Sequence, residues 1–176
     1  MALRIEPLRR GHRALLADFR NQHATLVLYL QRFATRHGER DLLSRTFVAI
    51  DTVGGTERLA GYFSLSAVSV ERDSVAVVPA LDRLPRFPVP GVLLARLAVD
   101  GRAQGQGLGR YLFEEALGLT LQLARSGPIG FRLLVTDAID QRAVDFYGHF
   151  GLTSLGDGLP CRMALDLLPL VMRPAR

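Results

Sequence analysis

The chain has 176 residues, of which 48% are hydrophobic, so it is long enough for one domain with a hydrophobic core. No apolar run approaches the roughly 20 residues of a transmembrane helix, and no apolar signal-peptide segment follows Met1. A single cysteine excludes an internal disulfide framework and a thiolate metal cluster. We therefore expect a cytoplasmic protein without a membrane span or a metal.

Positive charge is concentrated near the N-terminus. Residues 1–45 contain nine arginines and four acidic residues, whereas the remaining residues contain 13 of each. Because arginine binds phosphate through paired hydrogen bonds, this segment suits a polyanionic partner; a solvated helix face is the alternative. The chain has no lysine, which excludes a Walker-A phosphate loop and Schiff-base chemistry.

The first quarter of the chain predicts a short strand and an amphipathic helix. Leu3–Leu8 has the composition of a strand. Apolar residues three and four apart predict a helix over Ala24–Leu43, which His37 and Gly38 interrupt or end. That periodicity places three arginines on one row: Arg32, Arg36 and Arg40.

A hairpin and a long loop are expected next. Arg45–Asp51 and Arg58–Val70 are rich in β-branched and aromatic residues, and a Gly-Gly turn separates them. Gly61, inside the second strand, marks a possible bulge. Four prolines in Val78–Gly91 exclude a helix or a central strand there, and such a long loop is typical of a binding loop.

The second half alternates strands and helices. An apolar strand runs from Val92 to Asp100, and an amphipathic helix follows a glycine-rich loop and stops before Gly127-Pro128. The remaining predicted elements are a strand over Gly130–Asp137, a helix over Asp140–Phe150 with Asp140 as N-cap and Gly151 as C-cap, and strands over Thr153–Leu155 and Arg162–Leu168. This order predicts an α/β (α+β) domain with a largely antiparallel sheet.

The glycine-rich loop has the features of an anion site. Gly105, Gly107 and Gly109 alternate where the strand gives way to the helix, so backbone N–H groups at a helix N-terminus face a phosphate. The dinucleotide pattern G-x-G-x-x-G is not met, because Arg110 stands where the third glycine belongs. The loop therefore predicts a pyrophosphate site outside a Rossmann fold, with a plain glycine-rich turn as the alternative.

Two motifs resemble those of the Gcn5-related N-acetyltransferases, the GNAT enzymes. Gln104-Gly105-Gln106-Gly107-Leu108-Gly109 fits the acetyl-CoA signature [Q/R]-x-x-G-x-[G/A], and a second registration begins at Arg102. Asp140-Gln141-Arg142-Ala143-Val144-Asp145-Phe146-Tyr147, followed by Phe150-Gly151-Leu152, resembles the family's N-x-x-A-x-x-F-Y…F-G-F helix, with Asp140 where Asn is commoner. The resemblance implies one GNAT domain over residues 1–176.

Four further segments resemble the GNAT toxins of toxin–antitoxin pairs: Ser44–Val48, Ala60–Leu65, Leu84–Pro88 and Leu94–Asp100. In those toxins the enzyme acetylates the α-amine of aminoacyl-tRNA, and a ribbon-helix-helix antitoxin blocks it. This resemblance implies acetyl-CoA as co-substrate, aminoacyl-tRNA and such an antitoxin as partners, and a homodimer.

The GNAT resemblance also implies roles for individual residues. Leu97 and Val99 pair with the pantetheine arm through their backbone, and the N–H of Val99 polarises the thioester carbonyl. Tyr147 protonates the departing thiolate, which a phenol with a pKa of about 10 can do at neutral pH. The residues implied for pyrophosphate binding are Gln104, Gly105, Gly107, Leu108, Gly109 and Arg110.

Arg96 interrupts the apolar run and lies on the strand face opposite Leu97 and Val99. A buried charge without a partner is costly, so Arg96 either pairs with an acid or reaches the acceptor substrate, as we also expect for Arg36 and Arg40. We expect structural roles for the histidines and for Cys161. No residue stands out as a general base. Two other functions stay open: a GNAT enzyme acting on a small amine or a protein N-terminus, and a non-catalytic module that binds CoA or RNA.

Overall fold

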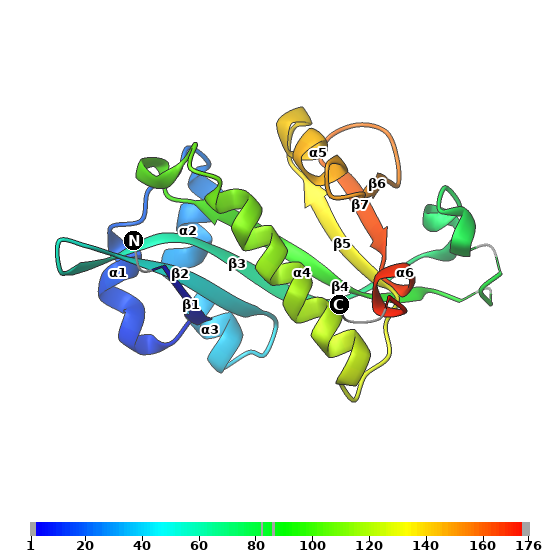
Figure 1. Ribbon diagram of the computed structural model, residues 1–176, viewed down its shortest axis with the longest axis horizontal. Coiled ribbons are helices and arrows are strands. Elements are labelled where there is room, and N and C mark those ends of the chain that lie inside the picture. Colours follow the sequence, from blue (N-terminus) through cyan, green and yellow to red (C-terminus); the bar gives the residue numbers. More distant parts are fainter. Residues whose placement is uncertain (1–2, 82, 86, 174–176) are drawn as a thin grey trace. The chain divides into compact units, whose positions relative to one another are not determined.

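The computed structural model describes residues 3–81, 83–85 and 87–173 (Figure 1). The strands are β1 (Arg4–Pro7), β2 (Arg45–Val53), β3 (Thr56–Val70), β4 (Val89–Val99), β5 (Leu133–Ala138), β6 (Thr153–Ser154) and β7 (Cys161–Asp166). The helices are α1 (Arg13–Ala17), α2 (Ala24–Arg32), α3 (Ala34–Glu39), α4 (Leu108–Ser126), α5 (Gln141–Gly148) and α6 (Leu168–Val171). The strands form a seven-stranded sheet in the order β1-β2-β3-β4-β5-β7-β6.

The sheet confirms the predicted mixed α/β class. Strands β1 and β2, β2 and β3, β5 and β7, and β6 and β7 pair antiparallel, whereas β4 and β5 are parallel. The parallel pairing covers only Gly91–Leu94 of β4. The second half of β4 therefore carries Leu97 and Val99 outside that ladder.

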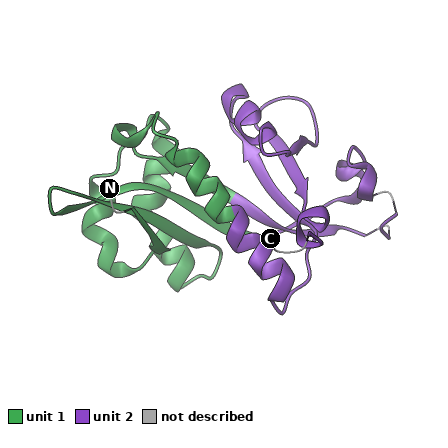
Figure 2. Ribbon diagram, viewed as in Figure 1, with its two compact units in different colours: residues 1–66, 95–116 green, residues 67–94, 117–176 purple. Residues whose placement is uncertain are grey.

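The chain divides into two compact units (Figure 2). Unit 1 comprises residues 1–66 and 95–116, and unit 2 comprises residues 67–94 and 117–176. The division falls within β4 and within α4. Each unit has its own core, and each is described by itself below.

In unit 1, helices cover both faces of the sheet. Phe19 and Leu30, from the N-terminal helical region, pack with Val48, Ile50 and other buried residues on one face. On the other face α4 comes so close to β3 that a Cβ on Gly61 would lie 2.7 Å from Leu112 Cδ1. That approach explains why position 61 has no side chain. The predicted bulge is present beside it, because the β2–β3 register shifts between Ala49 and Ile50.

The N-terminal helices differ from the prediction. The expected helix over Ala24–Leu43 is two helices that meet at Phe33, and it ends at Glu39 rather than Leu43. At the junction Phe33 has φ −116°, outside ideal helical geometry, while Ala34 is buried. The arginine row is thereby divided, with Arg32 on α2 and Arg36 on α3. Helix α1 was not predicted, because five residues give too short a periodic pattern.

Unit 2 has a second core around β5 and β7. Val70 at the end of β3 packs there with Leu133 and Val135 of β5. Val75 and Leu81 of the β3–β4 connection belong to the same core. The connection spans residues 71–88 and contains short 3₁₀ turns. The prediction that Val78–Gly91 holds no central strand is wrong for Val89–Gly91, which begin β4. Arg86, part of the Leu84–Pro88 motif, lies outside the described residues.

The C-terminal elements follow the prediction closely, with shorter bounds. Asp140 caps α5, since its Oδ1 accepts a hydrogen bond from Ala143 N–H at 2.8 Å. Gly151 has φ +86° but lies two residues beyond the C-cap, which is His149. The last strand ends at Asp166, and the short helix α6 follows it where the strand was expected to continue.

Candidate active site

The carboxyl end of β4 is held by a buried carboxylate. Asp100 is fully buried, and its Oδ2 accepts the N–H of Arg20 at 3.0 Å while Oδ1 accepts the N–H of Arg102 at 2.9 Å. The Arg102 side chain also bonds to both oxygens, at 2.7 and 2.9 Å, and reaches Asp18 Oδ2 at 2.7 Å. Burial opposes ionisation of Asp100, but these hydrogen bonds outweigh it and lower its pKa.

This network favours one of the two registrations of the glycine motif, the one that begins at Gln104. The Arg102 guanidinium is committed to Asp100 and Asp18, so it does not point its donors to a pyrophosphate. The registration that begins at Gln104 also places the helix start correctly, because α4 begins at Leu108. We therefore keep Gln104 as the first residue of the motif.

The last peptide of β4 receives two side-chain donors. The carbonyl oxygen of Val99 accepts hydrogen bonds from Asn21 Nδ2 at 2.8 Å and from Gln104 Nε2 at 3.4 Å. The next N–H, that of Asp100, donates to Ala60 O at 2.8 Å. These contacts hold the peptide between Val99 and Asp100 from both sides, and that peptide directly follows the one that carries the Val99 N–H.

The glycine loop has the geometry of an anion site. Gly105 and Gly107 have φ of +76° and +78°, and a Cβ added to either would meet no atom within 4 Å. Their conformation and the open space around them let a ligand approach the backbone closely. The 19-residue helix α4 begins at once after Gly107, so its first N–H groups and its dipole favour a negative charge there.

The other predicted loop residues take different positions. Leu108 is buried, and Gly109 is the second residue of α4, where an added Cβ would lie 3.7 Å from Val99 Cγ2. Arg110 is exposed and forms an ion pair with Glu114 at 2.8 Å. An exposed pair of this kind contributes little to stability.

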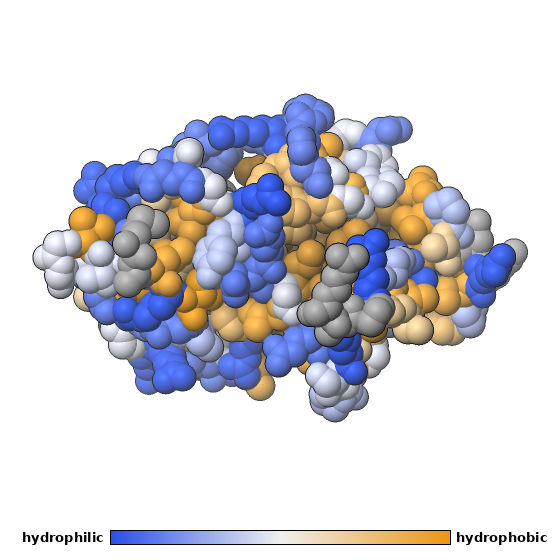
Figure 3. All heavy atoms as spheres, in the orientation of Figure 1, coloured by the Kyte–Doolittle hydropathy of each residue, from blue (hydrophilic) through white to orange (hydrophobic). Residues whose placement is uncertain are grey.

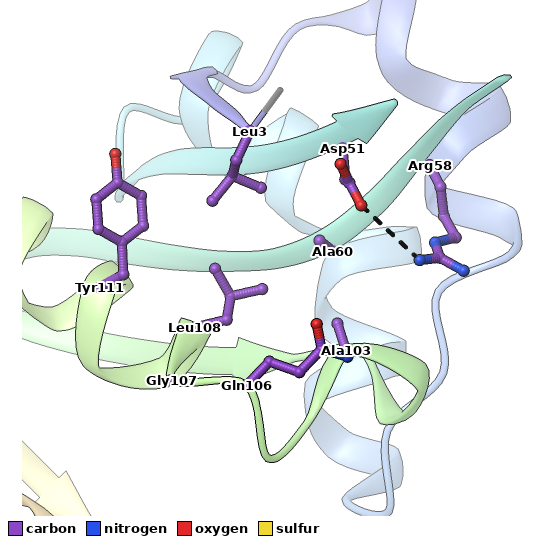
Figure 4. Close-up of a pocket in the computed structure, with 9 residues that line it drawn as sticks. All are labelled: Leu3, Asp51, Arg58, Ala60, Ala103, Gln106, Gly107, Leu108 and Tyr111. Atoms are coloured by element: carbon purple, nitrogen blue, oxygen red, sulfur yellow. Dashed lines mark ion pairs between the residues drawn. The ribbon is translucent and has the colours of Figure 1, made fainter. Parts of the chain in front are cut away.

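A pocket of about 190 Å³ adjoins the loop (Figure 4). Gln106 and Gly107 line one side of it, and Asp51 and Arg58, from β2 and β3, line another; the nearest oxygen and nitrogen of this ion pair are 3.9 Å apart. Asp51 Oδ1 and Arg58 Nε are buried without a hydrogen-bond partner. The wall of this pocket opposite the glycine loop is therefore partly polar. No sequence motif indicated these two residues.

Tyr147 is buried in unit 2. Its ring packs edge-on against Phe146 at 5.1 Å between centroids, and Thr136 of β5 interacts with its hydroxyl. Burial raises the pKa of Tyr147, while the hydrogen bond with Thr136 acts in the opposite direction. Tyr147 is therefore protonated at neutral pH, as a proton donor must be.

Arg96 does not pair with an acid within the described residues. Its guanidinium carbon lies 3.6 Å from the centroid of the Tyr29 ring, a cation–π contact within unit 1. The first alternative from the sequence, a buried ion pair, is therefore wrong. Arg36, by contrast, contacts Asp41 at 2.8 Å, and the exposed Arg40 lies 4.0 Å from the same carboxylate.

Three contributors to the site were missed by the sequence motifs: Asn21, Asp18 and Tyr29. Asn21 lies 78 residues from the carbonyl that it contacts, and no local pattern reports such a pairing. Cys161 is buried, as predicted. His12 contacts Glu6 at 2.8 Å and His149 contacts the carbonyl of Asp145 at 2.7 Å, which agrees with the predicted structural roles.

Within the described ranges, no cluster of three His, Cys, Asp or Glu residues has the arrangement of a metal site. In the same part of the chain, no helix has the length and apolar composition needed to cross a membrane.

Similar proteins identify the fold. The crystal structure of a KacT mutant with one tyrosine replaced by phenylalanine superposes with a TM-score of 0.84 at 23% identity, covering 94% of this chain and 95% of that chain. AtaT complexed with acetyl-methionyl-tRNAfMet superposes with a TM-score of 0.83 at 23% identity, covering 96% and 97%. AtaT bound to the C-terminus of the antitoxin AtaR and acetyl-CoA gives 0.75 at 22% identity, covering 97% and 99%.

Sequence comparison identifies the family. A tRNA-acetylating toxin of Mycobacterium tuberculosis is 41% identical over 96 residues, which are 53% of this chain and 54% of the toxin. The chain thus matches about half the length of this curated relative. The model of the acetyltransferase (GNAT) family matches residues 12–152, which include both the glycine loop and Tyr147. The chain therefore belongs to the acetyltransferase (GNAT) family.

Proposed function

We propose that this protein is an acetyl-CoA-dependent N-acetyltransferase whose acceptor is the α-amine of aminoacyl-tRNA. The observation that carries the proposal is the loop Gln104–Gly107, whose two glycines with positive φ open onto the start of α4. Family membership supports the reaction class, and the tRNA-acetylating relative supports the acceptor. We further propose that residues 1–176 form one GNAT domain made of both units.

The proposed roles follow the chemistry of each group. Bound acetyl-CoA supplies an activated acyl group in the form of a thioester. Gly105, Gly107 and the first turn of α4 bind the pyrophosphate with backbone N–H groups, and Gly109 leaves room beside Val99. Arg110 and the Gln104 backbone complete the binding of that anion. The side chain of Gln104 instead supports the Val99 carbonyl.

Acyl transfer needs a fixed donor for the carbonyl oxygen and a proton for the departing sulfur. Val99 suits the first role, because the β5 ladder ends before it and because Asn21 and Gln104 hold the adjoining peptide through the Val99 carbonyl. Leu97, two residues earlier on the same strand, offers its backbone to the pantetheine arm. Tyr147 suits the second role, because burial keeps its hydroxyl protonated.

The acceptor side draws on arginine. Arg96, Arg36 and Arg40 are our candidates for contacts with the tRNA, and all three lie in unit 1. By analogy with AtaT, whose complex with AtaR is known, we expect a ribbon-helix-helix antitoxin as a protein partner, and we expect a homodimer. An enzyme acting on charged tRNA works in the cytoplasm, which is where we place this protein.

The decisive experiment incubates the protein with labelled acetyl-CoA and a pool of aminoacyl-tRNA, with free amino acids and small amines in parallel reactions. We expect the label to appear on the aminoacyl-tRNA. Hydrolysis of the ester bond should then release this label as N-acetylated amino acid. Label on small amines alone would contradict the tRNA acceptor and support a small-molecule acetyltransferase.

A second experiment separates an enzyme from a non-catalytic binding module. Tyr147→Phe removes only the hydroxyl, and we expect kcat to fall about 10- to 1000-fold with little change in the KM for acetyl-CoA. Phe146→Tyr adds a hydroxyl to the neighbouring ring and is the control for a general disturbance of α5. Unchanged turnover in Tyr147→Phe would remove Tyr147 from the mechanism.

A further inference from the structure

We infer that Arg96, stacked on Tyr29, is a preformed phosphate site that binds a phosphodiester at the 3′ end of the acceptor RNA. This inference rests on the proposed function, since it names a contact for that acceptor. It does not follow from the GNAT motifs, because Tyr29 belongs to neither of them.

The first step is the state of the Arg96 side chain. It is half-buried, and within the described residues no carboxylate lies within ion-pair distance of it. The nearest acid along β4, Asp100, is saturated by Arg102 and by the N–H of Arg20. A half-buried cation without a counter-ion is costly unless a ligand supplies the negative charge.

The second step is the rigidity of the platform. Tyr29 is 4% exposed, its hydroxyl lies 2.8 Å from Ser44 Oγ, and its ring stacks on Tyr62 at 6.4 Å between centroids. Arg96 Cζ lies 3.6 Å above the Tyr29 ring centre. A guanidinium held by its face on an aromatic ring keeps the N–H groups along its edge free for the paired hydrogen bonds that a phosphate accepts.

The third step is the source of the phosphate. The Arg96 side chain lies on the face of β4 that packs against α2. The Val99 side chain alternates to the other face, where a Cβ on Gly109, next to the proposed pyrophosphate loop, would lie 3.7 Å from Val99 Cγ2. Helix α2, which packs on that face, is part of residues 1–45, the segment that carries the excess positive charge. A phosphate of CoA is thus the less suitable ligand. A phosphodiester of the RNA acceptor end is the anion that the proposed acceptor would bring to this face.

The test compares steady-state kinetics of Arg96→Gln, Arg96→Lys and the unchanged protein. For Arg96→Gln we expect the KM for aminoacyl-tRNA to rise about 10- to 100-fold, as for the loss of one charge-assisted contact, while the KM for acetyl-CoA is retained. The slope of log KM for aminoacyl-tRNA against log salt concentration should fall by about 0.7–1. Arg96→Lys restores the charge but not the paired geometry, so it should recover only part of the loss.

Two further variants test the platform. Tyr29→Phe keeps the ring and should retain the KM, whereas Tyr29→Leu should raise the KM for aminoacyl-tRNA. Because the ring acts through Arg96, the double variant Tyr29→Leu with Arg96→Gln should have the same KM for aminoacyl-tRNA as Arg96→Gln alone. Arg142→Gln, an exposed arginine on α5, is the matched control for loss of one positive charge.

The outcomes separate this inference from the proposed function. An unchanged protein that is inert towards aminoacyl-tRNA overturns the proposed function itself. An active protein whose Arg96→Gln variant keeps its KM, or loses affinity for acetyl-CoA instead, overturns only the phosphate site. If Arg96→Gln lowers both kcat and the melting temperature, and leaves the salt dependence of the KM for aminoacyl-tRNA unchanged, Arg96 has a structural role and the phosphate site is overturned.

Discussion

At the scale of single residues, Tyr147 makes a prediction about pH. Burial raises the pKa of its phenol above the ordinary value of about 10, so the protonated donor persists through the neutral and mildly alkaline range. We expect kcat to show no fall that is due to loss of this proton below pH 10. A descending limb of kcat with an apparent pKa below 10 that disappears in Tyr147→Phe would contradict the assignment.

Asp100 predicts an effect on stability rather than on chemistry. It accepts hydrogen bonds from Arg20 and Arg102, and replacement by Asn leaves Arg102 without its main partner. We expect Asp100→Asn to lower the free energy of unfolding by about 2–3 kcal/mol at neutral pH, measured by urea denaturation.

The pH dependence of that difference gives a check on its origin. Because the folded-state pKa of Asp100 is lowered, its charge stabilises the fold above the unfolded value of about 3.9, and this contribution is lost as pH falls through the folded-state pKa. The gap between the variant and the unchanged protein should therefore narrow below about pH 4. A gap that stays constant down to pH 2 would point to packing instead of charge.

At the scale of elements, the glycines around α4 predict opposite effects. Gly107 has φ +78°, so Gly107→Ala strains the loop by about 1–2 kcal/mol and places a methyl group where the ligand approaches. Gly118 is inside α4 with open space around it, so Gly118→Ala should stabilise the protein by about 0.5–1 kcal/mol. We expect a raised KM for acetyl-CoA in Gly107→Ala only. A raised KM in both variants would mean that the helix, not the loop, controls binding.

The elements also show what the sequence could and could not predict. The helix at Gln141–Gly148 and the strand–loop–helix unit around Gly105 were predicted because capping, periodicity and glycine spacing are local signals. The break at Phe33 was not predicted; it lies next to Ala34, which is buried in a core with residues of β2 and β3 that are distant in the sequence. The ties of Asn21 to Val99 and of Arg96 to Tyr29 join distant segments, so only the tertiary structure reveals them.

At the scale of the whole molecule, the uneven charge is its most informative property. The net charge is +5, and residues 1–45 supply all of it. Hydrophilic side chains cover the lower edge of unit 1 in Figure 3, where α1 and α3 lie in Figure 1. Several arginines of this segment are already in surface ion pairs, such as Arg10 with Glu39 and Arg36 with Asp41. Because exposed ion pairs are weak, these arginines can leave their acidic partners to contact a polyanion.

Asp41 is the acid whose removal tests this reading. It contacts both Arg36 and Arg40, so Asp41→Asn should release two arginines and lower the Kd for tRNA about two- to fivefold at low salt, with the gain vanishing at high salt. Asp157→Asn makes the same change of net charge at an exposed position in unit 2 and is the matched control. If both variants lower the Kd for tRNA by the same factor, net charge alone governs affinity. If only Asp41→Asn lowers it, Arg36 and Arg40 contact the RNA directly.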